Sequence, residues 1–240
     1  MSMIETYAPS TPPALHDQGR WNLTRLRRLK RELEGMLEES GPLLRRLLDI
    51  LAAGTGLVLL FPVLLLAALG ILLTSRGAIL YAQERVGQHG NPFQMLKLRT
   101  MVEGADGMKA ALAAQKPEAT QGVRFKLRRD PRVTTVGRIL RKLSIDELPQ
   151  LWNVVVGDMT LIGPRPPLWQ EVVRYDARAL RRLEVRPGLT CLWQVSGRSD
   201  LSFEQQVALD LEYIDRVKPH QELLILARTL PAVITGRGAY

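Results

Sequence analysis

The most prominent pattern in the chain is an apolar run over residues 50–75 that contains no charged residue. A soluble helix of this length normally keeps a polar face, so the run predicts a membrane-embedded helix. Pro62 lies at its centre and should kink or break that helix. Arg45 and Arg46 precede the run and Arg76 follows it, and positive charge usually marks the cytoplasmic side. Two topologies stay open on these residues: a transmembrane helix that tolerates proline, and a re-entrant helix that leaves by the face it entered.

The residues before this run divide into two parts. Residues 1–20 are rich in Pro, Ser and Thr and predict a flexible tail. Residues 21–41 place leucines on one face and basic side chains on the other, which indicates a basic amphipathic helix that ends at Gly41-Pro42. Such a helix can lie on a membrane surface or pack on the rest of the protein, and the sequence favours neither.

Residues 77–240 predict a mixed domain of short strands and helices. The stretches 78–86 and 93–101 alternate like β-strands, and GQHGNP between them is a turn sequence. Helices are expected over 144–156, over about 168–183, and from a capping box at Ser202 and Gln205 to Pro219. The fold class is therefore α+β and predominantly helical, with a small β element. The last apolar segment, 222–235, is too short to span a bilayer and belongs to the core or the interface.

Composition narrows the function. The chain carries 33 Lys and Arg against 24 Asp and Glu, a net charge of +9, which favours anionic partners. Its single cysteine, Cys191, excludes an internal disulfide and a multi-cysteine zinc site, and its neighbours Leu192 and Trp193 predict burial. The basic stretch 124–142 contains only one aromatic residue, Phe125, so it lacks the stacking platforms of single-strand nucleic-acid binders. We therefore expect no nucleic-acid partner.

The chemistry concentrates in the block RKLSIDELPQLWNVVVGDMTLIGPRP, where Asp146 and Glu147 follow Arg141. Ser144 and Glu147 have the spacing of a capping box, which alone would explain the glutamate. Asp146 would then lie at a helix N-terminus, where the helix dipole should keep its carboxylate ionised. An ionised carboxylate among guanidinium groups suits a magnesium ligand or a nucleophile towards phosphorus.

At this block the sequence resembles the bacterial sugar transferases, the monotopic polyprenyl-phosphate sugar-1-phosphate transferases. The resemblance covers about residues 42–235 and rests on motifs in the family's order: the Pro62 helix, YAQERVGQHGNPFQMLKLRTM, SIDELPQLWNVVVGDMTLIGPRP and RPGLTCLWQVSGR. It implies transfer of a sugar 1-phosphate from a UDP-sugar to a polyprenyl phosphate, usually undecaprenyl phosphate, with release of UMP. This would be the first membrane step of a surface polysaccharide or glycoconjugate pathway.

The resemblance also implies roles for individual residues. Asp146 matches the family's nucleophile, which forms an aspartyl phospho-sugar intermediate and lies at the Mg²⁺ site as its ligand. Glu147 matches the second acid of the dyad, whose role is metal or nucleophile positioning or proton handling. The cations expected to bind the phosphates of the two substrates are Arg141, Arg165, Lys97 and Arg99. Arg141 and Arg165 are the strongest candidates, because Pro164 and Pro166 restrict the backbone around Arg165.

The family topology decides between the two membrane arrangements in favour of a Pro-broken re-entrant helix over residues 42–76. It places interfacial amphipathic helices and a catalytic domain, residues 77–240, on the cytoplasmic face of the bacterial inner membrane, in contact with one leaflet. A homodimer is left open. Two other classes remain as alternatives, a non-catalytic membrane scaffold that kept the fold and a membrane-tethered nucleic-acid binder. VSGRSDLSF resembles members that use hexose donors such as UDP-glucose or UDP-galactose, but the donor sugar is not assigned.

Overall fold

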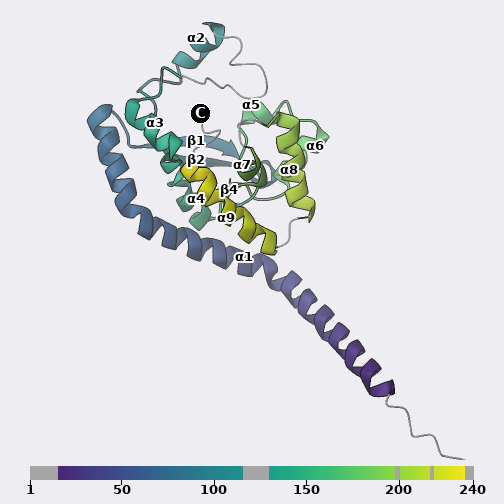
Figure 1. Cartoon of the computed structure of the whole chain (residues 1–240). Helices are drawn as coiled ribbons and strands as arrows, with labels where there is room; N and C mark the ends of the chain where they lie inside the picture. Colours follow the sequence, from purple (N-terminus) through teal and green to yellow (C-terminus); the bar gives the residue numbers. More distant parts are fainter. Residues whose placement is uncertain (1–15, 116–129, 198–200, 217–218, 236–240) are drawn as a thin grey trace, which may run out of the picture. The chain divides into compact units, whose positions relative to one another are not determined.

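The structure is a computed structural model, and it describes residues 16–115, 130–197, 201–216 and 219–235 (Figure 1). Within these ranges the chain is mostly helical, as expected. The α-helices are α1 His16–Thr74, α2 Met108–Gln115, α3 Thr135–Lys142, α4 Gln150–Val156, α5 Trp169–Val172, α6 Ala177–Leu180, α7 Leu192–Ser196, α8 Phe203–Arg216 and α9 Pro219–Thr235. Three-residue 3-10 turns form η1 Gln88–Gly90, η3 Ile145–Glu147 and η4 Arg181–Leu183.

The chain forms two compact units, residues 1–47 and 48–240, and the boundary falls inside α1. The first unit contains the N-terminal part of α1, which begins at His16, inside the expected tail. Residues 1–15 of that tail lie outside the described residues, as do residues 124–129 of the basic stretch. The apolar part of α1 belongs to the second unit.

The small β element consists of two separate pairs of strands. β1 (Leu80–Val86) and β2 (Pro92–Leu98) form the expected antiparallel hairpin, with Tyr81 opposite Lys97. η1 closes its turn, where His89 and Gly90 both adopt positive φ angles. β3 (Thr160–Ile162) and β4 (Gly188–Thr190) pair in parallel, and α9 packs on both of them and on α7.

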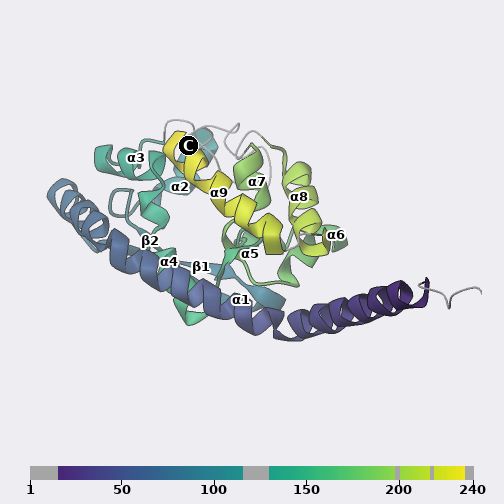
Figure 2. The same ribbon diagram turned by 60° about the horizontal axis from the view of Figure 1, so that its bottom comes forward.

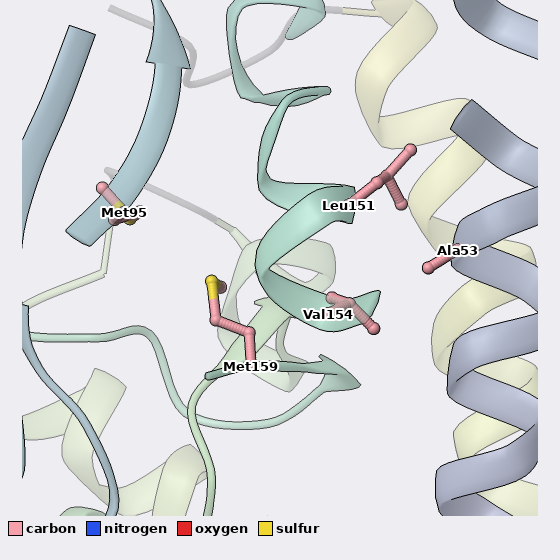
Figure 3. Packing of buried hydrophobic residues seen from close by; sticks show 5 residues of the cluster. All are labelled: Ala53, Met95, Leu151, Val154 and Met159. Carbon is pink, nitrogen blue, oxygen red and sulfur yellow. The ribbon is translucent and has the colours of Figure 1, made fainter. Parts of the chain in front are cut away.

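One face of the apolar part of α1 packs along the second unit over its whole length. Ala53 contacts the core formed by Leu151 and Val154 of α4, and Figure 3 shows both side chains directed at α1. Met159 and Met95 continue this core on the far side of α4. About four turns further along α1, a second core begins, formed by residues from α1, β2 and α3: Ala67, Ile71, Leu98 and Leu140. The packed face is thus rich in small residues, which let a helix approach its neighbours closely.

The opposite face of α1 is apolar and exposed. Its largest exposed side chains include Val58, Leu59, Phe61, Leu66 and Leu73. Residues Gly41–Thr74 are long and apolar enough to cross a membrane, and only 11% of their most apolar 18-residue stretch is buried in the structure. A surface of this size and composition is not left in water, so the membrane-facing prediction for this helix stands.

Of the two expectations for prolines in α1, the helix end at Gly41-Pro42 is contradicted, whereas at Pro62, expected to kink or break the helix, only the break is absent. Helical residues continue through Gly41-Pro42, so the predicted end of the amphipathic helix is wrong, and they continue through Pro62 without a break. A proline removes one backbone donor, and a long helix can absorb that loss by bending instead of ending. Figures 1 and 2 show that α1 changes direction within its apolar part.

The helix expected over residues 168–183 is also wrong, because the structure divides it into α5, α6 and η4. Asp176 separates them by capping α6, its carboxylate accepting a hydrogen bond from the N–H of Ala179. The capping box of α8 is confirmed: Ser202 N–H donates to Gln205, and Gln205 N–H donates to the Ser202 hydroxyl. α8 is anchored in the core by its buried side chains Val207 and Leu211.

Asp49 fixes α1 to the second unit at the start of the apolar run. Its side chain is buried, and one carboxylate oxygen accepts a hydrogen bond of 2.6 Å from the Thr160 hydroxyl. The other oxygen accepts from the N–H of Leu161 at 3.2 Å. A buried carboxylate with two donors from β3 sets both the rotation and the axial position of α1 against the sheet.

We expect Asp49→Ala to lower the free energy of unfolding by roughly 1–3 kcal/mol, because it leaves two buried donors without their acceptor. Chemical denaturation of the detergent-solubilised protein measures this loss. Asp215→Ala is the matched control, since Asp215 is an exposed partner of Arg181 and such surface pairs contribute little. Equal stability of Asp49→Ala and the control would contradict the anchoring role.

Candidate active site

The two adjacent acids lie on a single 3-10 turn between two short helices. α3 ends at Lys142, Ser144 adopts a left-handed backbone with φ of 53°, and η3 then carries Asp146 and Glu147. The predicted capping box is wrong: the Ser144 side chain makes no capping hydrogen bond, and α4 begins only at Gln150. Pro149 is the N-cap residue of α4, and because proline has no N–H to donate back into the preceding turn, it is tolerated at a helix start.

Glu147 bonds to a cation on the neighbouring hairpin. The Nζ of Lys97 lies 2.8 Å from its carboxylate, and both side chains are partly exposed. This ion pair joins β2 to η3 and places Lys97 beside Glu147. It is also the long-range contact that outcompetes the local capping box.

Asp146 is buried, with 7% of its surface exposed, and its pKa is raised to about 6. Burial is the largest cause and the charge of Glu147 the second, while Lys97 and Arg141 oppose them. The expectation that a helix dipole controls the pKa of this group is therefore wrong, because no α-helix starts at Asp146. The carboxylate is mostly ionised at neutral pH, yet its charge is held at a cost in energy, which makes it a better nucleophile and metal ligand.

Arg141 is held on the same side by α3. Its Nε donates a hydrogen bond of 2.9 Å to the hydroxyl of Thr100, and its charge acts on Asp146. The close approach of α3 to Thr100 depends on Gly137, where an added Cβ would lie 2.0 Å from the Thr100 carbonyl oxygen. Sequence reasoning missed Thr100 and Gly137. A glycine inside a short helix costs about 1 kcal/mol, and that cost was the available signal for a close contact.

The other two predicted cations lie in different surroundings. Arg99 donates from Nη2 to the carbonyl and the hydroxyl of Ser75, just beyond the end of α1, at 2.9 and 3.0 Å. This geometry assigns it to holding the helix C-terminus. Arg165 lies in the loop of residues 163–167, and its charge acts on Cys191, which is buried as predicted. The structure thus gathers Asp146, Glu147, Lys97 and Arg141 around η3, whereas Arg99 is engaged at α1.

Metal-binding potential at this turn is limited to oxygen ligands. Among the described residues, no group of three or more His, Cys, Asp or Glu side chains could enclose an ion. Two adjacent carboxylates, one of them buried, are the ligands that Mg²⁺ takes when substrate phosphates and waters complete its shell. The residues at η3 therefore fit a magnesium ion that binds together with a phosphorylated substrate.

Comparison with known proteins decides the family. Residues 41–236 match the family described as bacterial sugar transferase. The chain belongs to this family. It is 41% identical to the exopolysaccharide production protein ExoY of Rhizobium meliloti, over 87% of this chain and 93% of that protein.

Two further members carry names that specify a reaction. The chain is 43% identical to the UDP-glucose:undecaprenyl-phosphate glucose-1-phosphate transferase of Caulobacter vibrioides, over 85% of this chain and 77% of that protein. It is 37% identical to the undecaprenyl-phosphate galactose phosphotransferase of Salmonella typhimurium, over 88% of this chain but 45% of that longer protein. The two names differ in the sugar and agree on the lipid acceptor.

We expect Asp146→Asn to stabilise this sugar transferase at pH 8 in metal-free buffer. Because the pKa of Asp146 is raised in the folded protein, the buried carboxylate is ionised only above about pH 6. Above that pH its ionisation lowers the free energy of unfolding by roughly 3 kcal/mol, the equivalent of about two pKa units. The gain should shrink as the pH falls through about 6 and disappear below about 4, where Asp146 is protonated in both the folded and the unfolded protein.

Denaturant titrations of wild type and variant between pH 4 and 8 measure this difference. Asp215→Asn is the control with the opposite sign, since Arg181 lowers the pKa of Asp215. A stability difference for Asp146→Asn that does not change with pH would contradict the raised pKa.

Proposed function

We propose that this protein transfers a sugar 1-phosphate from a UDP-sugar to a polyprenyl phosphate and releases UMP. The observation that carries the proposal is the buried carboxylate of Asp146, with Glu147, Lys97 and Arg141 around it, in a member of the sugar transferase family. The names of the Caulobacter and Salmonella relatives support this reaction and an undecaprenyl acceptor. The name of the Rhizobium relative supports a place in exopolysaccharide production.

The chemistry proceeds in two displacements at one phosphorus atom. The Asp146 carboxylate attacks the β-phosphorus of the UDP-sugar, an oxygen–phosphorus bond forms, and the bond to the bridging oxygen breaks, with its electron pair leaving on UMP. An oxygen of the polyprenyl phosphate then attacks the same phosphorus and releases the Asp146 carboxylate. The product is a lipid diphosphate-sugar, and the enzyme is regenerated without an added reductant, oxidant or water.

The surroundings of Asp146 suit both steps. Burial raises the basicity of the carboxylate, which strengthens it as a nucleophile while leaving it mostly ionised at neutral pH. Arg141 and Lys97 supply positive charge next to the reacting phosphorus, and phosphoryl transfer depends mainly on such charge neutralisation and positioning. Glu147, held by Lys97, keeps a second negative charge beside Asp146, which suits a role in positioning a divalent cation.

Magnesium is the cofactor that this arrangement favours. Bound at Asp146 with Glu147 close by, it would neutralise negative charge on the diphosphate of the donor and so make its phosphorus more electrophilic. The described residues offer carboxylates rather than sulfur or imidazole ligands at η3, which favours a hard cation over zinc.

The packing of α1 supports a monotopic arrangement. Its contacts with the second unit run from Asp49 to Ile71, so the helix lies along the catalytic domain instead of projecting from it. If such a helix stood across a bilayer, the polar domain beside it would have to enter the hydrocarbon, where buried charges and backbone groups are costly. A helix that lies in one leaflet, with the domain on the cytoplasmic face, avoids this cost. It also brings Asp146 to the level of a lipid phosphate.

We expect Asp146→Asn to abolish UMP release from UDP-sugars in the presence of undecaprenyl phosphate, because the amide cannot form the acyl phosphate. A panel of UDP-hexoses assayed with the purified wild type identifies the donor and provides the reference rate. Radiolabel from the sugar should remain on wild-type protein incubated without the lipid, and on none of the Asp146→Asn protein. Turnover of the variant above a few per cent of wild type would exclude Asp146 as the nucleophile.

We expect chelation by EDTA to stop UMP release and added Mg²⁺ to restore it, with Mn²⁺ as a substitute. Thermal unfolding of the chelated protein should change little, because the ion binds with the substrate and not as a structural element. Full turnover in excess EDTA would exclude the magnesium proposal.

We expect a cysteine at position 10, in a Cys191→Ser background, to resist a membrane-impermeant thiol reagent added from the periplasmic side. The same cysteine should react after the membrane is permeabilised, and that reaction is the control for accessibility. The reason is that a helix lying in one leaflet keeps the chain before it on the cytoplasmic face. Labelling of intact cells or spheroplasts from outside would contradict the monotopic arrangement.

A further inference from the structure

The loop of residues 163–167 has the sequence Gly-Pro-Arg-Pro-Pro, in which three of five residues have no N–H group. Such a loop cannot form internal backbone hydrogen bonds of the usual kind, so its carbonyl groups need donors from elsewhere. The loop also carries Arg165, the cation with the most restricted backbone among the predicted phosphate ligands. What holds the loop therefore determines where that guanidinium can point.

Four consecutive carbonyls of this loop accept hydrogen bonds from segments far away in the sequence. The donors, in order along the loop, are Gly188 N–H to Pro164 at 2.9 Å, Arg182 Nη2 to Arg165 at 3.5 Å, Arg85 Nη1 to Pro166 at 3.1 Å and Val86 N–H to Pro167 at 3.0 Å. Two donors are backbone groups of β4 and β1. The other two are arginine side chains, which a substitution can remove without altering the main chain.

Arg182 is a charged side chain that lies in the core and meets the loop from there. Only 1% of its side chain is exposed, and its Nη2 lies 2.8 Å from the equally buried carboxylate of Asp210 on α8. Its Nη1 donates to the Tyr175 hydroxyl at 2.8 Å, and its guanidinium lies 5.5 Å from the centre of the Tyr175 ring. A buried arginine is tolerated only when it is paired in this way. The pairing fixes the direction in which Arg182 meets the loop.

Arg85 holds the next carbonyl from the opposite side. It is buried, its Nη1 donates to Pro166, and its Nη2 donates to Gln83 on the same strand at 2.6 Å. The two arginines thus contact two successive peptide groups, through the carbonyl of Arg165 in the first and the carbonyl of Pro166 in the second. A planar guanidinium with several donors can hold a carbonyl and a second partner at once, which a lysine ammonium does less well.

We propose that Arg85 and Arg182 are positioning residues that hold the 163–167 loop so that Arg165 is preorganised for a substrate phosphate. This inference rests on the proposed sugar-1-phosphate transfer. Neither arginine needs to touch the substrate, since each acts through a loop carbonyl. Holding the loop in place before binding lowers the entropy lost when Arg165 binds a phosphate. Removing either arginine's contact with the loop should therefore weaken substrate binding more than it slows the chemical step.

The test is a double-variant cycle between each positioning residue and Arg165. Arg85→Lys and Arg182→Lys keep the positive charge but not the guanidinium fork, and Arg165→Ala removes the presented group. KM is measured for both phosphate substrates, and the relevant one is the substrate whose KM rises in Arg165→Ala. For that substrate we expect each Lys variant to raise KM about tenfold and to change kcat less than about threefold. In the Arg165→Ala background, the same Lys substitutions should have no further effect on KM.

Arg181→Lys is the matched control. Arg181 is adjacent to Arg182 in η4, but it is exposed and pairs with Asp215 at 2.6 Å, with no contact to the loop. Its KM should equal that of wild type in both backgrounds. A second pair of substitutions, Arg182→Met with Asp210→Asn, removes the charge from both sides of the buried pair. It covers the case in which Arg182→Lys fails to fold, as judged by thermal unfolding.

The outcomes separate this inference from the function on which it rests. A wild-type protein that releases no UMP overturns both. An active wild type in which the Lys substitutions raise KM equally with and without Arg165 shows that the arginines act on general stability, and it overturns the positioning role alone. Effects confined to the Arg165 background, with Arg181→Lys silent, support it.

Discussion

The lengthwise packing of an apolar helix on a polar domain is the constraint on which the rest of this structure depends. Ala53 and Ala67 bring α1 close to α4, β2 and α3, and Asp49 fixes its register through two hydrogen bonds from β3. The other face of the helix remains apolar and exposed. One face of the helix is thus covered by the domain, and the other has the apolar character of a lipid-facing surface.

The active-site turn is built from elements that this helix supports. β2 and α3 share a core with α1, and they contribute Lys97 and Arg141, whose charges both act on Asp146. The turn buries Asp146 while leaving it next to Glu147, so that burial and like charge both raise its pKa. Stability is given up at this carboxylate, because burial and the neighbouring charge both disfavour its ionised form.

Buried charged side chains inside the second unit hold a loop in place as well as packing in the core. The Arg182–Asp210 pair is almost completely buried, and Arg85 is buried beside Gln83. An apolar substitute of similar volume often stabilises a core equally well, so a buried ion pair needs a further reason. Here the further reason is that both arginines donate hydrogen bonds to carbonyls of the proline-rich 163–167 loop, whose own backbone has few N–H donors.

The sequence by itself determined the features that depend on local pattern. These include the apolar helix, the β1–β2 hairpin, the capping box at Ser202, the burial of Cys191 and the membership of Asp146 and Glu147 in one functional block. It failed where distant groups compete with local ones. Lys97 takes the carboxylate that the capping box had assigned to the backbone. Ser75 accepts hydrogen bonds from the guanidinium of Arg99, and α1 continues through Gly41-Pro42, where the local sequence predicted its end. Only the tertiary structure could decide these contacts, because their partners are separated by tens of residues and their energies depend on burial that no local pattern records.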